Sequence, residues 1–224
     1  MELTFLGHAC FLLDDGTHKV LIDPHLSGNP LAAAKAEDVE ADFICVTHGH
    51  GDHIGDSVEI AQRTGAKVFC TVDLAGAVYR PAGVKAMGGN LGGTASMPFG
   101  SIKIFPAIHG SGVAGGLACG FIIEIGGKKI YHAGDTALMA DMALLAEENI
   151  DVALLPIGDF YTMGPKDALR AVKMIRPSLT IPMHYNTFPA IHQDPHAFAE
   201  SVKAAGFAAA VLNPGDRISL RKGR

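Results

Sequence analysis

Residues 47–53 read THGHGDH and bring three imidazoles and one carboxylate into a single short segment. Imidazole and carboxylate are ligands that suit zinc, iron and similar ions. The first two histidines stand two residues apart in a glycine-spaced loop, so both rings can face one ion, while the aspartate and the third histidine can face a second. Gly49 and Gly51 permit the tight backbone that this requires. The segment therefore supplies four candidate metal ligands: His48, His50, Asp52 and His53.

Three further candidates follow other predicted strands. His109 ends SIKIFPAIH, Asp135 follows IYHAG, and His184 follows LTIPM. Taken singly each is weak, because a lone histidine after an apolar strand often belongs to the core and an aspartate at this position can cap a helix. In layered α/β folds, however, ligands bind at the carboxyl ends of strands. Their shared placement predicts that they join the THGHGDH segment in one site.

The rest of the chain predicts alternating strands and helices, which indicates α/β layers. Residues 2–23 predict antiparallel strands with a turn at 14–16, and Gly126-Gly127 predicts a second hairpin. Residues 82–100 are rich in glycine and predict loops with one short strand at most. The predicted helices are 54–64, 137–148, 165–175 and 195–205, and the remaining predicted strands are 41–48, 66–72, 101–109, 151–158, 179–185, 209–213 and 216–220.

Length and composition favour one domain over 1–224 that folds on its own core, since 48% of the 224 residues are hydrophobic. A net charge of −5 lacks the basic footprint of a protein that binds long nucleic acids. The beginning of the chain does not resemble a signal peptide, and no apolar run reaches the roughly 20 residues of a membrane helix. We therefore expect a cytoplasmic protein that does not associate with membranes. Four cysteines without C-x-x-C spacing predict buried free thiols: Cys10, Cys45, Cys70 and Cys119.

The order H-x-H-x-D-H, single histidine, G-D-T and late histidine resembles the metallo-β-lactamase superfamily over nearly the whole chain. The resemblance implies a four-layer αββα sandwich with a dinuclear site at one edge. It also implies that Asp135 bridges two ions. The remaining ligands would divide between the ions, with His48, His50 and His109 on the first and Asp52, His53 and His184 on the second.

Three other segments narrow the resemblance. FLGHACFLL at 5–13, LIDPHLSGNP at 21–30 and TMGPKDA at 162–168 are similar to a branch of uncharacterised metal-dependent hydrolases. That branch lies near the ascorbate-6-phosphate lactonase and N-acyl-phosphatidylethanolamine phospholipase D types. The chain lacks the extra domain of RNA-processing members and the long C-terminal region of glyoxalase II.

The expected cofactor is a pair of divalent ions, zinc first, with manganese, iron or nickel as alternatives. Such a pair, about 3.5–4 Å apart, shares a bridging hydroxide that can attack a carbonyl or phosphoryl group. We therefore expect a hydrolase that cleaves an ester, lactone or phosphoester bond of a small-molecule substrate. Asp135 would hold the ions at their separation, and Asp52 would relay a proton besides binding metal.

Several residues beside the ligands are candidates for further roles. His8 is expected either to bind substrate or transfer a proton, or to be structural and paired with a carboxylate such as Asp23. His132 is expected to support the site or the core. Polar residues on the loops after two late strands are candidate substrate contacts: Asp159, Tyr161, Asn186 and Thr187. The glycine-rich loop 109–116 is a candidate flap, and four more histidines are expected at the surface or rim: His18, His25, His192 and His196.

Other functions remain open at this stage. One is a phosphodiesterase or nuclease on the same site, and another is a non-catalytic metal-binding or regulatory protein. A di-iron oxidoreductase on the same fold would favour a carboxylate in place of His50 and carry a flavin domain, and the chain has neither. The sequence leaves the substrate, the metal and the oligomeric state, including a homo-oligomer, undecided.

Overall fold

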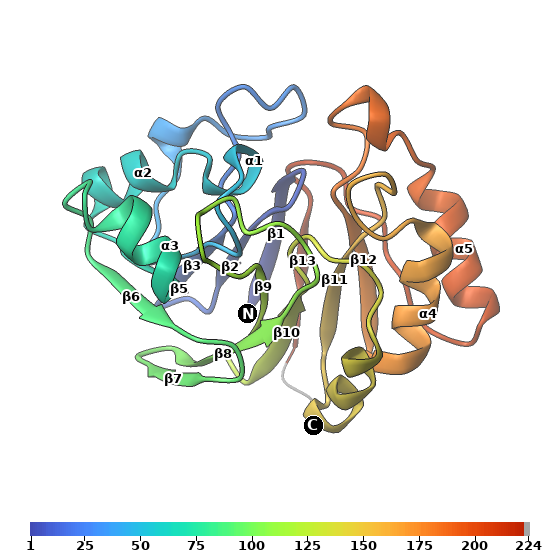
Figure 1. The fold of residues 1–224 in the computed structure, drawn as a ribbon. Coiled ribbons are helices and arrows are strands. Elements are labelled where there is room, and N and C mark those ends of the chain that lie inside the picture. The colour runs from blue at the N-terminus through green and yellow to red at the C-terminus, as the bar shows by residue number, and fades with distance from the viewer. Residues whose placement is uncertain (222–224) are drawn as a thin grey trace.

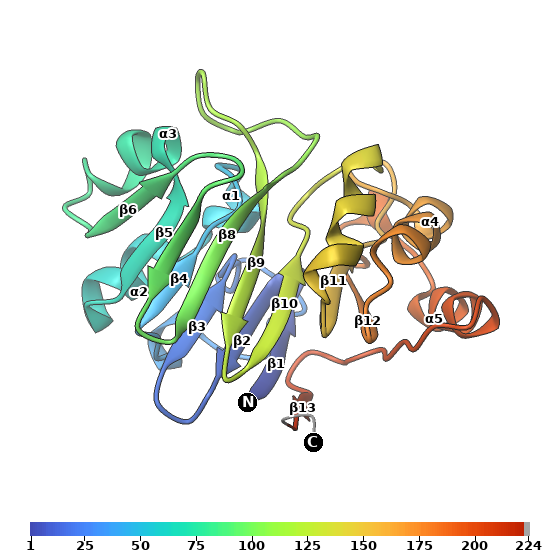
Figure 2. The same ribbon diagram turned by 90° about the horizontal axis from the view of Figure 1, so that it is seen from below.

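The computed structural model describes residues 1–221 and contains two mixed β-sheets that lie face to face (Figures 1 and 2). The first sheet has seven strands in the order β13 (Arg217–Ser219), β1 (Glu2–Gly7), β2 (Cys10–Asp14), β3 (Lys19–Ile22), β4 (Phe43–Cys45), β5 (Lys67–Thr71) and β6 (Ala86–Gly89). The second has six in the order β12 (Leu179–Met183), β11 (Val152–Pro156), β10 (Lys128–His132), β9 (Cys119–Ile125), β8 (Gly100–Pro106) and β7 (Thr94–Met97).

Each sheet begins with antiparallel hairpins and continues with parallel strands. In the first sheet β1, β2 and β3 pair antiparallel, and β3 to β6 pair parallel. In the second, β7 to β10 pair antiparallel, and β10 to β12 pair parallel. The predicted turn at Gly126-Gly127 joins β9 and β10 with φ values of 59° and 74°, which glycine adopts without strain. The two hairpins predicted from sequence are therefore present.

Helices cover the outer faces of both sheets. Figure 1 shows α2 (Ser57–Thr64) and α3 (Val72–Leu74) on one side and α4 (Pro165–Ile175) and α5 (Pro195–Ala204) on the other. Proline begins α4, where its missing N–H costs nothing, and a left-handed Gly65 ends α2. The four-layer αββα arrangement expected from the sequence is confirmed. The described chain also contains 3-10 and π-helical segments: η1 (Ala36–Asp38), the π-helical η2 (Ala75–Tyr79), η3 (Ala140–Glu148) and η4 (Pro189–Ile191).

Two apolar clusters stabilise these layers. The larger fills the space between the sheets and continues under α4 and α5, and its largest side chains include Phe11, Phe121 and Tyr131. The smaller lies between the first sheet and α2. Every residue of β11 is buried, because this strand has a sheet on one face and a helix on the other. Full burial of one such side chain contributes about 1.5–3 kcal/mol.

Three expectations about secondary structure were wrong. Residues 209–213 form no strand, because only Ala209 bridges to Thr180 before the chain crosses to β13 in the other sheet. The segment 82–100 contains two strands, β6 and β7, where the sequence predicted one at most, because both have only four residues and two of those in β6 are glycine. The predicted helix 137–148 is a 3-10 helix from Ala140, in which the two buried residues, Met142 and Leu145, stand three apart as that helix requires.

One edge of the sandwich collects the loops that follow β4, β8, β10 and β12. The short helix α1 (Gly51–Ile54) lies at this edge, at the top of Figure 1. The segments 46–50, 107–110, 133–136 and 184–191 join it there, so all seven predicted metal ligands arrive from loops that the two sheets hold. Within the described residues, no helix combines the length and hydropathy needed to cross a bilayer.

Candidate metal centre

The structure brings all seven predicted ligands together. Their ligand atoms form three overlapping groups, and within each group every atom lies within 4.8 Å of the others. One group contains the three residues expected at the first ion: His48, His50 and His109. A second contains the three expected at the second ion together with His8: His8, Asp52, His53 and His184. The third joins the two sites: His48, His53 and Asp135.

The backbone of the THGHGDH segment explains how neighbours in sequence serve different groups. The chain is extended up to His50 and then turns into α1, which carries Asp52 and His53 to the other side. The segment is thus a loop followed by a helical turn, and not a loop throughout as expected. Gly49 donates its N–H to the Ser111 carbonyl at 2.7 Å, and a Cβ here would lie 2.9 Å from that oxygen. The contact fixes the loop of His109 against that of His48 and His50.

Asp135 lies between the two groups. Its Oδ2 is 3.4 Å from His109 Nε2 and 3.2 Å from His184 Nε2. Its Oδ1 is 3.3 Å from His53 Nε2, and the side chain is 3% exposed. The Asp135 carboxylate thus contacts members of both groups, with Oδ2 alone lying near one histidine of each, which is the placement that a bridging ligand requires.

The unpaired atoms of the site fit divalent cations. Among the described residues, His53 Nε2, His184 Nε2 and Asp135 Oδ1 are buried without a hydrogen-bond partner. Buried polar atoms are nearly always satisfied, and each exception costs free energy. A cation between these atoms would satisfy all three. Imidazole nitrogen with carboxylate oxygen is a donor set that zinc and related ions accept.

Burial and neighbouring charges shift the pKa values of several residues at the site. Burial lowers the pKa of His8 and of His48 to about 3, so both rings are neutral at pH 7. Burial alone would raise the pKa of Asp135, but His53 and His184 hold it well below its usual range. Burial likewise opposes a charge on His53, yet Asp135 and Asp23 raise the pKa of that ring. A metal ligand must be deprotonated, so an ion at His53 would displace a proton.

Asp23 supports both groups, and its role was not predicted. Its Oδ2 accepts hydrogen bonds from His53 Nδ1 at 2.7 Å and from the Thr47 hydroxyl at 2.7 Å. Thr47 Oγ1 in turn accepts from His48 Nδ1 at 3.0 Å. Both rings thereby direct Nε2 to the cluster, as outer-sphere partners of metal ligands commonly arrange. The sequence carries one signal for this role, because Asp23 directly follows the apolar strand KVLI. A carboxylate buried at that position needs hydrogen-bond or ion-pair partners.

His8 is held between the site and a later loop. Its Nδ1 lies 2.9 Å from Thr187 Oγ1, and its Nε2 lies 3.2 Å from Asp52 Oδ2. Since the ring is neutral, it donates from Nε2 to the carboxylate and accepts from the threonine hydroxyl. The expected pairing of His8 with Asp23 is wrong, because Asp52 takes that place. A φ of 58° at His8 gives the backbone strain that is often found at functional sites.

His132 lies in the core behind the site. Its Nε2 donates to the Ala9 carbonyl at 2.9 Å, and its Nδ1 accepts from Gly134 N at 3.1 Å. Both nitrogens are therefore satisfied within the protein, and the ring ties β10 to the turn between β1 and β2. Its place outside the three ligand groups fits a supporting role.

A cavity of about 780 Å³ opens onto the cluster. His50, Asp52, His109, Asp135 and His184 form its polar floor. Of the four predicted substrate contacts, only Tyr161 is among the residues that line it. Asp159 lines a separate cavity at the start of α4, Asn186 bonds Gln193 N through its side chain at 2.8 Å, and Thr187 contacts His8. His25 lies at the rim as expected.

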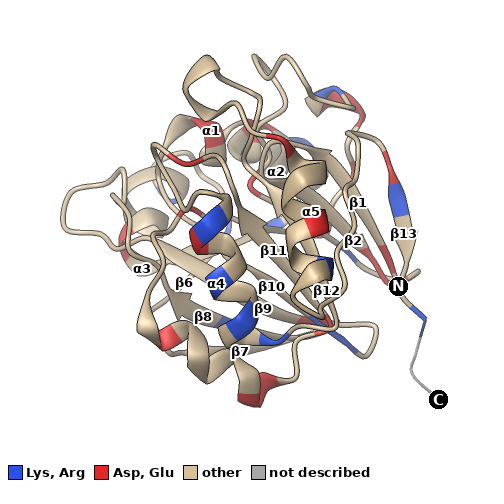
Figure 3. Ribbon diagram, turned by 90° about the vertical axis from the view of Figure 1, so that its right-hand side faces the viewer, with Lys and Arg blue, Asp and Glu red and all other residues tan. Residues whose placement is uncertain are grey.

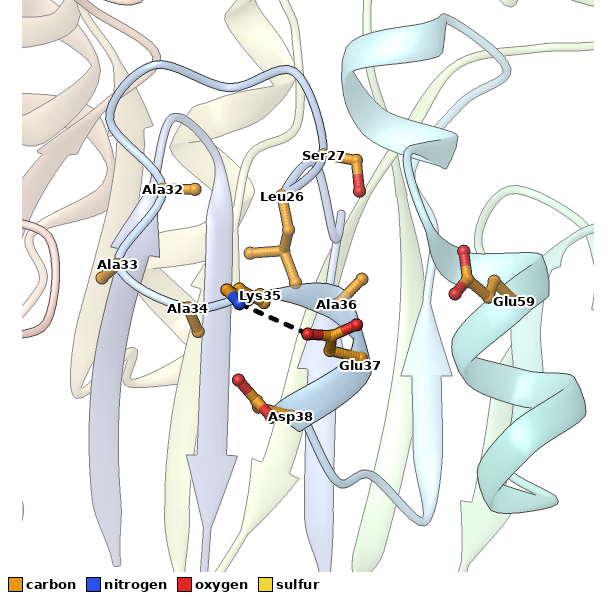
Figure 4. Close-up of a pocket in the computed structure, with 10 residues that line it drawn as sticks. All are labelled: Leu26, Ser27, Ala32, Ala33, Ala34, Lys35, Ala36, Glu37, Asp38 and Glu59. Atoms are coloured by element: carbon orange, nitrogen blue, oxygen red, sulfur yellow. Dashed lines mark hydrogen bonds and ion pairs between the residues drawn. The ribbon is translucent and has the colours of Figure 1, made fainter.

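A second cavity lies away from the cluster. It measures about 580 Å³ and is enclosed by the segment 32–38, by Leu26 and Ser27, and by Glu59 of α2 (Figure 4). The Lys35–Glu37 ion pair at its side spans 3.4 Å between two exposed side chains, which contributes little to stability. No histidine or cysteine is among the residues that line it, so it lacks the metal chemistry of the first cavity.

Comparison with known proteins agrees with this geometry. The family described as the Beta-lactamase superfamily domain matches residues 18–185, a span that contains all seven predicted ligands. The chain is 49% identical over 233 residues to a "UPF0173 metal-dependent hydrolase" of Heliobacterium modesticaldum, covering 98% of both chains. It is 50% identical over 230 residues to another of the same name from Pelotomaculum thermopropionicum, covering 98% of this chain and 100% of that one.

Solved structures give the same result. The structure of Igni18, described as a novel metallo hydrolase from Ignicoccus hospitalis, superposes with a TM-score of 0.93 at 39% sequence identity and covers 99% of both chains. An isothiocyanate hydrolase from Delia radicum gut bacteria superposes with a TM-score of 0.79 at 21% identity, which shows a shared fold. This chain therefore belongs to the metallo-β-lactamase superfamily, within the family of the UPF0173 metal-dependent hydrolases.

Proposed function

We propose that this metal-dependent hydrolase binds two divalent ions, zinc first, and cleaves an ester, lactone or phosphoester bond of a small-molecule substrate. The observation that carries the proposal is the position of Asp135, which lies within 3.4 Å of His109 in one ligand group and within 3.3 Å of His53 in the other. A site for a single ion would need only one of these groups.

Each group has a defined donor set. His48, His50 and His109 would hold the first ion, and Asp52, His53 and His184 the second, with Asp135 between them. When bound, the two ions would supply an activated water and a positive charge opposite the oxygen on which charge develops during cleavage. The chain's own contribution is to hold seven ligands on a rigid edge, which fixes the separation of the ions.

Asp52 and His8 are proposed to handle the proton of the reaction. Asp52 Oδ2 lies 3.2 Å from His8 Nε2 and 3.8 Å from His184 Nε2. The same oxygen therefore contacts a candidate ligand, His184, and a residue outside the seven expected ligands, His8. On the other side of the ring, His8 Nδ1 lies 2.9 Å from the Thr187 hydroxyl oxygen. Because Nε2 of the neutral His8 ring already carries the hydrogen of this contact, Asp52 would be the group that accepts the proton, and His8 would orient its carboxylate.

The test combines metal content with hydrolysis. The protein is purified without added metal, reconstituted with zinc, and measured by elemental analysis and with an aryl ester, a lactone and an aryl phosphodiester. We expect about two ions per chain and turnover of at least one class. In the same assays His50→Ala should lose turnover, whereas His196→Ala, which removes an exposed histidine of α5, should behave as the wild type.

Two results would contradict the proposal. Turnover that survives in His50→Ala would place the reaction elsewhere in the protein. A zinc-reconstituted wild type that holds two ions and turns over none of the three classes would favour a binding role over hydrolysis.

A further inference from the structure

We propose that the part of the substrate that lies away from the metal ions is uncharged and apolar, an aryl or alkyl group, and that Tyr161 and Phe188 bind it. This inference rests on the proposed function, because it concerns the same cavity. It adds a substrate class that the ligand set alone does not select.

The wall of the cavity above the ligands is apolar. Tyr161, Phe188, Pro189 and Ala190 line it, and they come from the loops after β11 and β12. The Phe188 ring is anchored, because its centroid lies 5.4 Å from that of His8 in an edge-to-face arrangement. Pockets that bind small molecules typically combine such an apolar wall with a few polar groups at the reacting end.

The loop that carries Tyr161 is held in an uncommon conformation. Asp159 and Phe160 have φ values of 61° and 40°, a region that costs free energy for residues other than glycine. Met163 anchors the end of the loop, since its N–H donates to the Thr136 carbonyl at 3.0 Å beside Asp135. The surrounding hydrogen bonds thus maintain a backbone that keeps an aromatic side chain at the cavity.

Aromatic surface continues from the cavity to the outside. Tyr161 is 52% exposed and Phe160 is 76% exposed, and their rings meet at right angles with centroids 4.8 Å apart. Exposed apolar side chains that form a contiguous patch often mark a binding surface, and this pair adjoins a cavity. The arrangement suits a flat or extended apolar group that reaches from the ligands toward solvent.

The charge of the cavity argues against an anionic substituent on the apolar wall. None of the residues that line it is lysine or arginine. Figure 3 shows basic residues along α4 instead, and Lys166 at its start lines the separate cavity with Asp159. A phosphate or carboxylate placed against the apolar wall would lose its hydration without gaining a cationic partner. An anionic group would be accepted only at the metal ions.

The test compares three 4-nitrophenyl esters of equal acyl length on the zinc-loaded enzyme. They end in a methyl group (hexanoate), in a carboxylate (hydrogen adipate) and in a strongly hydrated primary ammonium group (6-aminohexanoate). The carboxylate and the ammonium carry opposite charges, so attraction to the metal ions affects them in opposite ways, whereas loss of hydration affects both alike. We expect kcat/KM for hexanoate to exceed that of both charged esters by about tenfold or more.

Two variants of Tyr161 test whether the apolar wall causes the preference for hexanoate. We compare kcat/KM for hexanoate with kcat/KM for acetate. Tyr161→Ala should lower this ratio by about fivefold, the size of one aromatic contact with the substrate. Tyr161→Phe keeps the ring and should retain the wild-type ratio. The same variants are titrated by calorimetry with 1-phenylhexan-1-one, a neutral ketone that cannot be hydrolysed. We expect the ketone to bind more weakly only when the ring is removed.

The outcomes are distinct. A charged ester that is hydrolysed as well as hexanoate would overturn the inference. If no ester is hydrolysed, the lactone and phosphodiester assays decide the proposed function, and the ketone decides the substrate class alone. Binding that weakens in Tyr161→Ala and not in Tyr161→Phe would then still support an apolar site, while equal binding by both variants, or none by the wild type, would refute it.

Discussion

His53 Nδ1 donates a hydrogen bond to Asp23 Oδ2 at 2.7 Å, and neither side chain is exposed to solvent. The same carboxylate reaches His48 through Thr47, so one residue behind the site orients a ligand in each group. Asp23 adopts a φ of 43°, which shows that the backbone is strained to present this carboxylate.

Asp23→Asn should weaken metal binding by about 10- to 100-fold, the usual cost of losing a partner behind a metal ligand. Both Asp23 oxygens accept hydrogen bonds from N–H or O–H groups. In the variant an NH2 group replaces one oxygen, so in either orientation of the amide a donor faces another donor and at least one hydrogen bond is lost. Zinc affinity is measured by competition with a chelating dye. Asp56→Asn is the matched control, because only one Asp56 oxygen accepts bonds, from Leu26 and Ser27, and the amide can keep them. An unchanged affinity in Asp23→Asn would refute this role.

Gly49→Ala should reduce metal content and turnover, whereas Gly51→Ala should not. A Cβ at Gly49 meets the Ser111 carbonyl at 2.9 Å and a Val113 methyl at 2.9 Å, so the loops of His50 and His109 must separate. No atom lies within 4 Å of a Cβ at Gly51, which begins α1. The expected loss of turnover is about 100-fold for a displacement near 1 Å. Equal behaviour of the two variants would show that this loop contact is unimportant.

Thr187→Val should lower kcat while zinc content stays at the wild-type level. The hydroxyl aligns His8, which contacts Asp52, and its loss leaves the imidazole without its partner at Nδ1. The expected decrease in kcat is about 10-fold, below the roughly 100- to 10,000-fold that direct proton transfer contributes, because the threonine acts only through His8. Thr187→Ser retains the hydroxyl and serves as the control. If Thr187→Val loses zinc together with activity, Thr187 supports the ligands and not the proton path.

Wild-type stability should fall as the pH drops below about 6.5, and part of this dependence should disappear in His132→Gln. Burial lowers the pKa of His132 below its ordinary value, so the unfolded chain binds a proton there at a pH where the folded protein does not. Stability is therefore full above the unfolded pKa and declines below it, by at most about 1.4 kcal/mol per pH unit for one group. Urea denaturation at pH 7.0 and 5.5 under identical metal conditions measures both slopes. Equal slopes in the two proteins would contradict the assignment.

The residues that sequence predicted best are those whose roles depend on local spacing. THGHGDH carries four candidate ligands within one segment, and the end of a buried strand marks His184, and the structure brings all five together. Pro165 and Gly65 likewise marked a helix start and a helix stop. Tyr161 was predicted as a substrate contact, but the support that Asp23 gives to His53 and His48 and the place of Phe188 beside Tyr161 were not predicted, because these partners lie far apart in sequence and meet only in the folded protein. One of the strands β6 and β7 escaped prediction, since each has only four residues and the glycines of β6 leave no alternating pattern to detect.

The central claim is that two ligand groups share Asp135, and metal stoichiometry tests it most directly. Zinc per chain is measured by elemental analysis after dialysis, in the wild type, in His109→Ala, in His184→Ala and in Asp135→Ala. We predict about two ions in the wild type, about one in each histidine variant, and fewer than one in Asp135→Ala. A wild type that binds one ion, or an Asp135→Ala variant that retains two ions, would contradict the account.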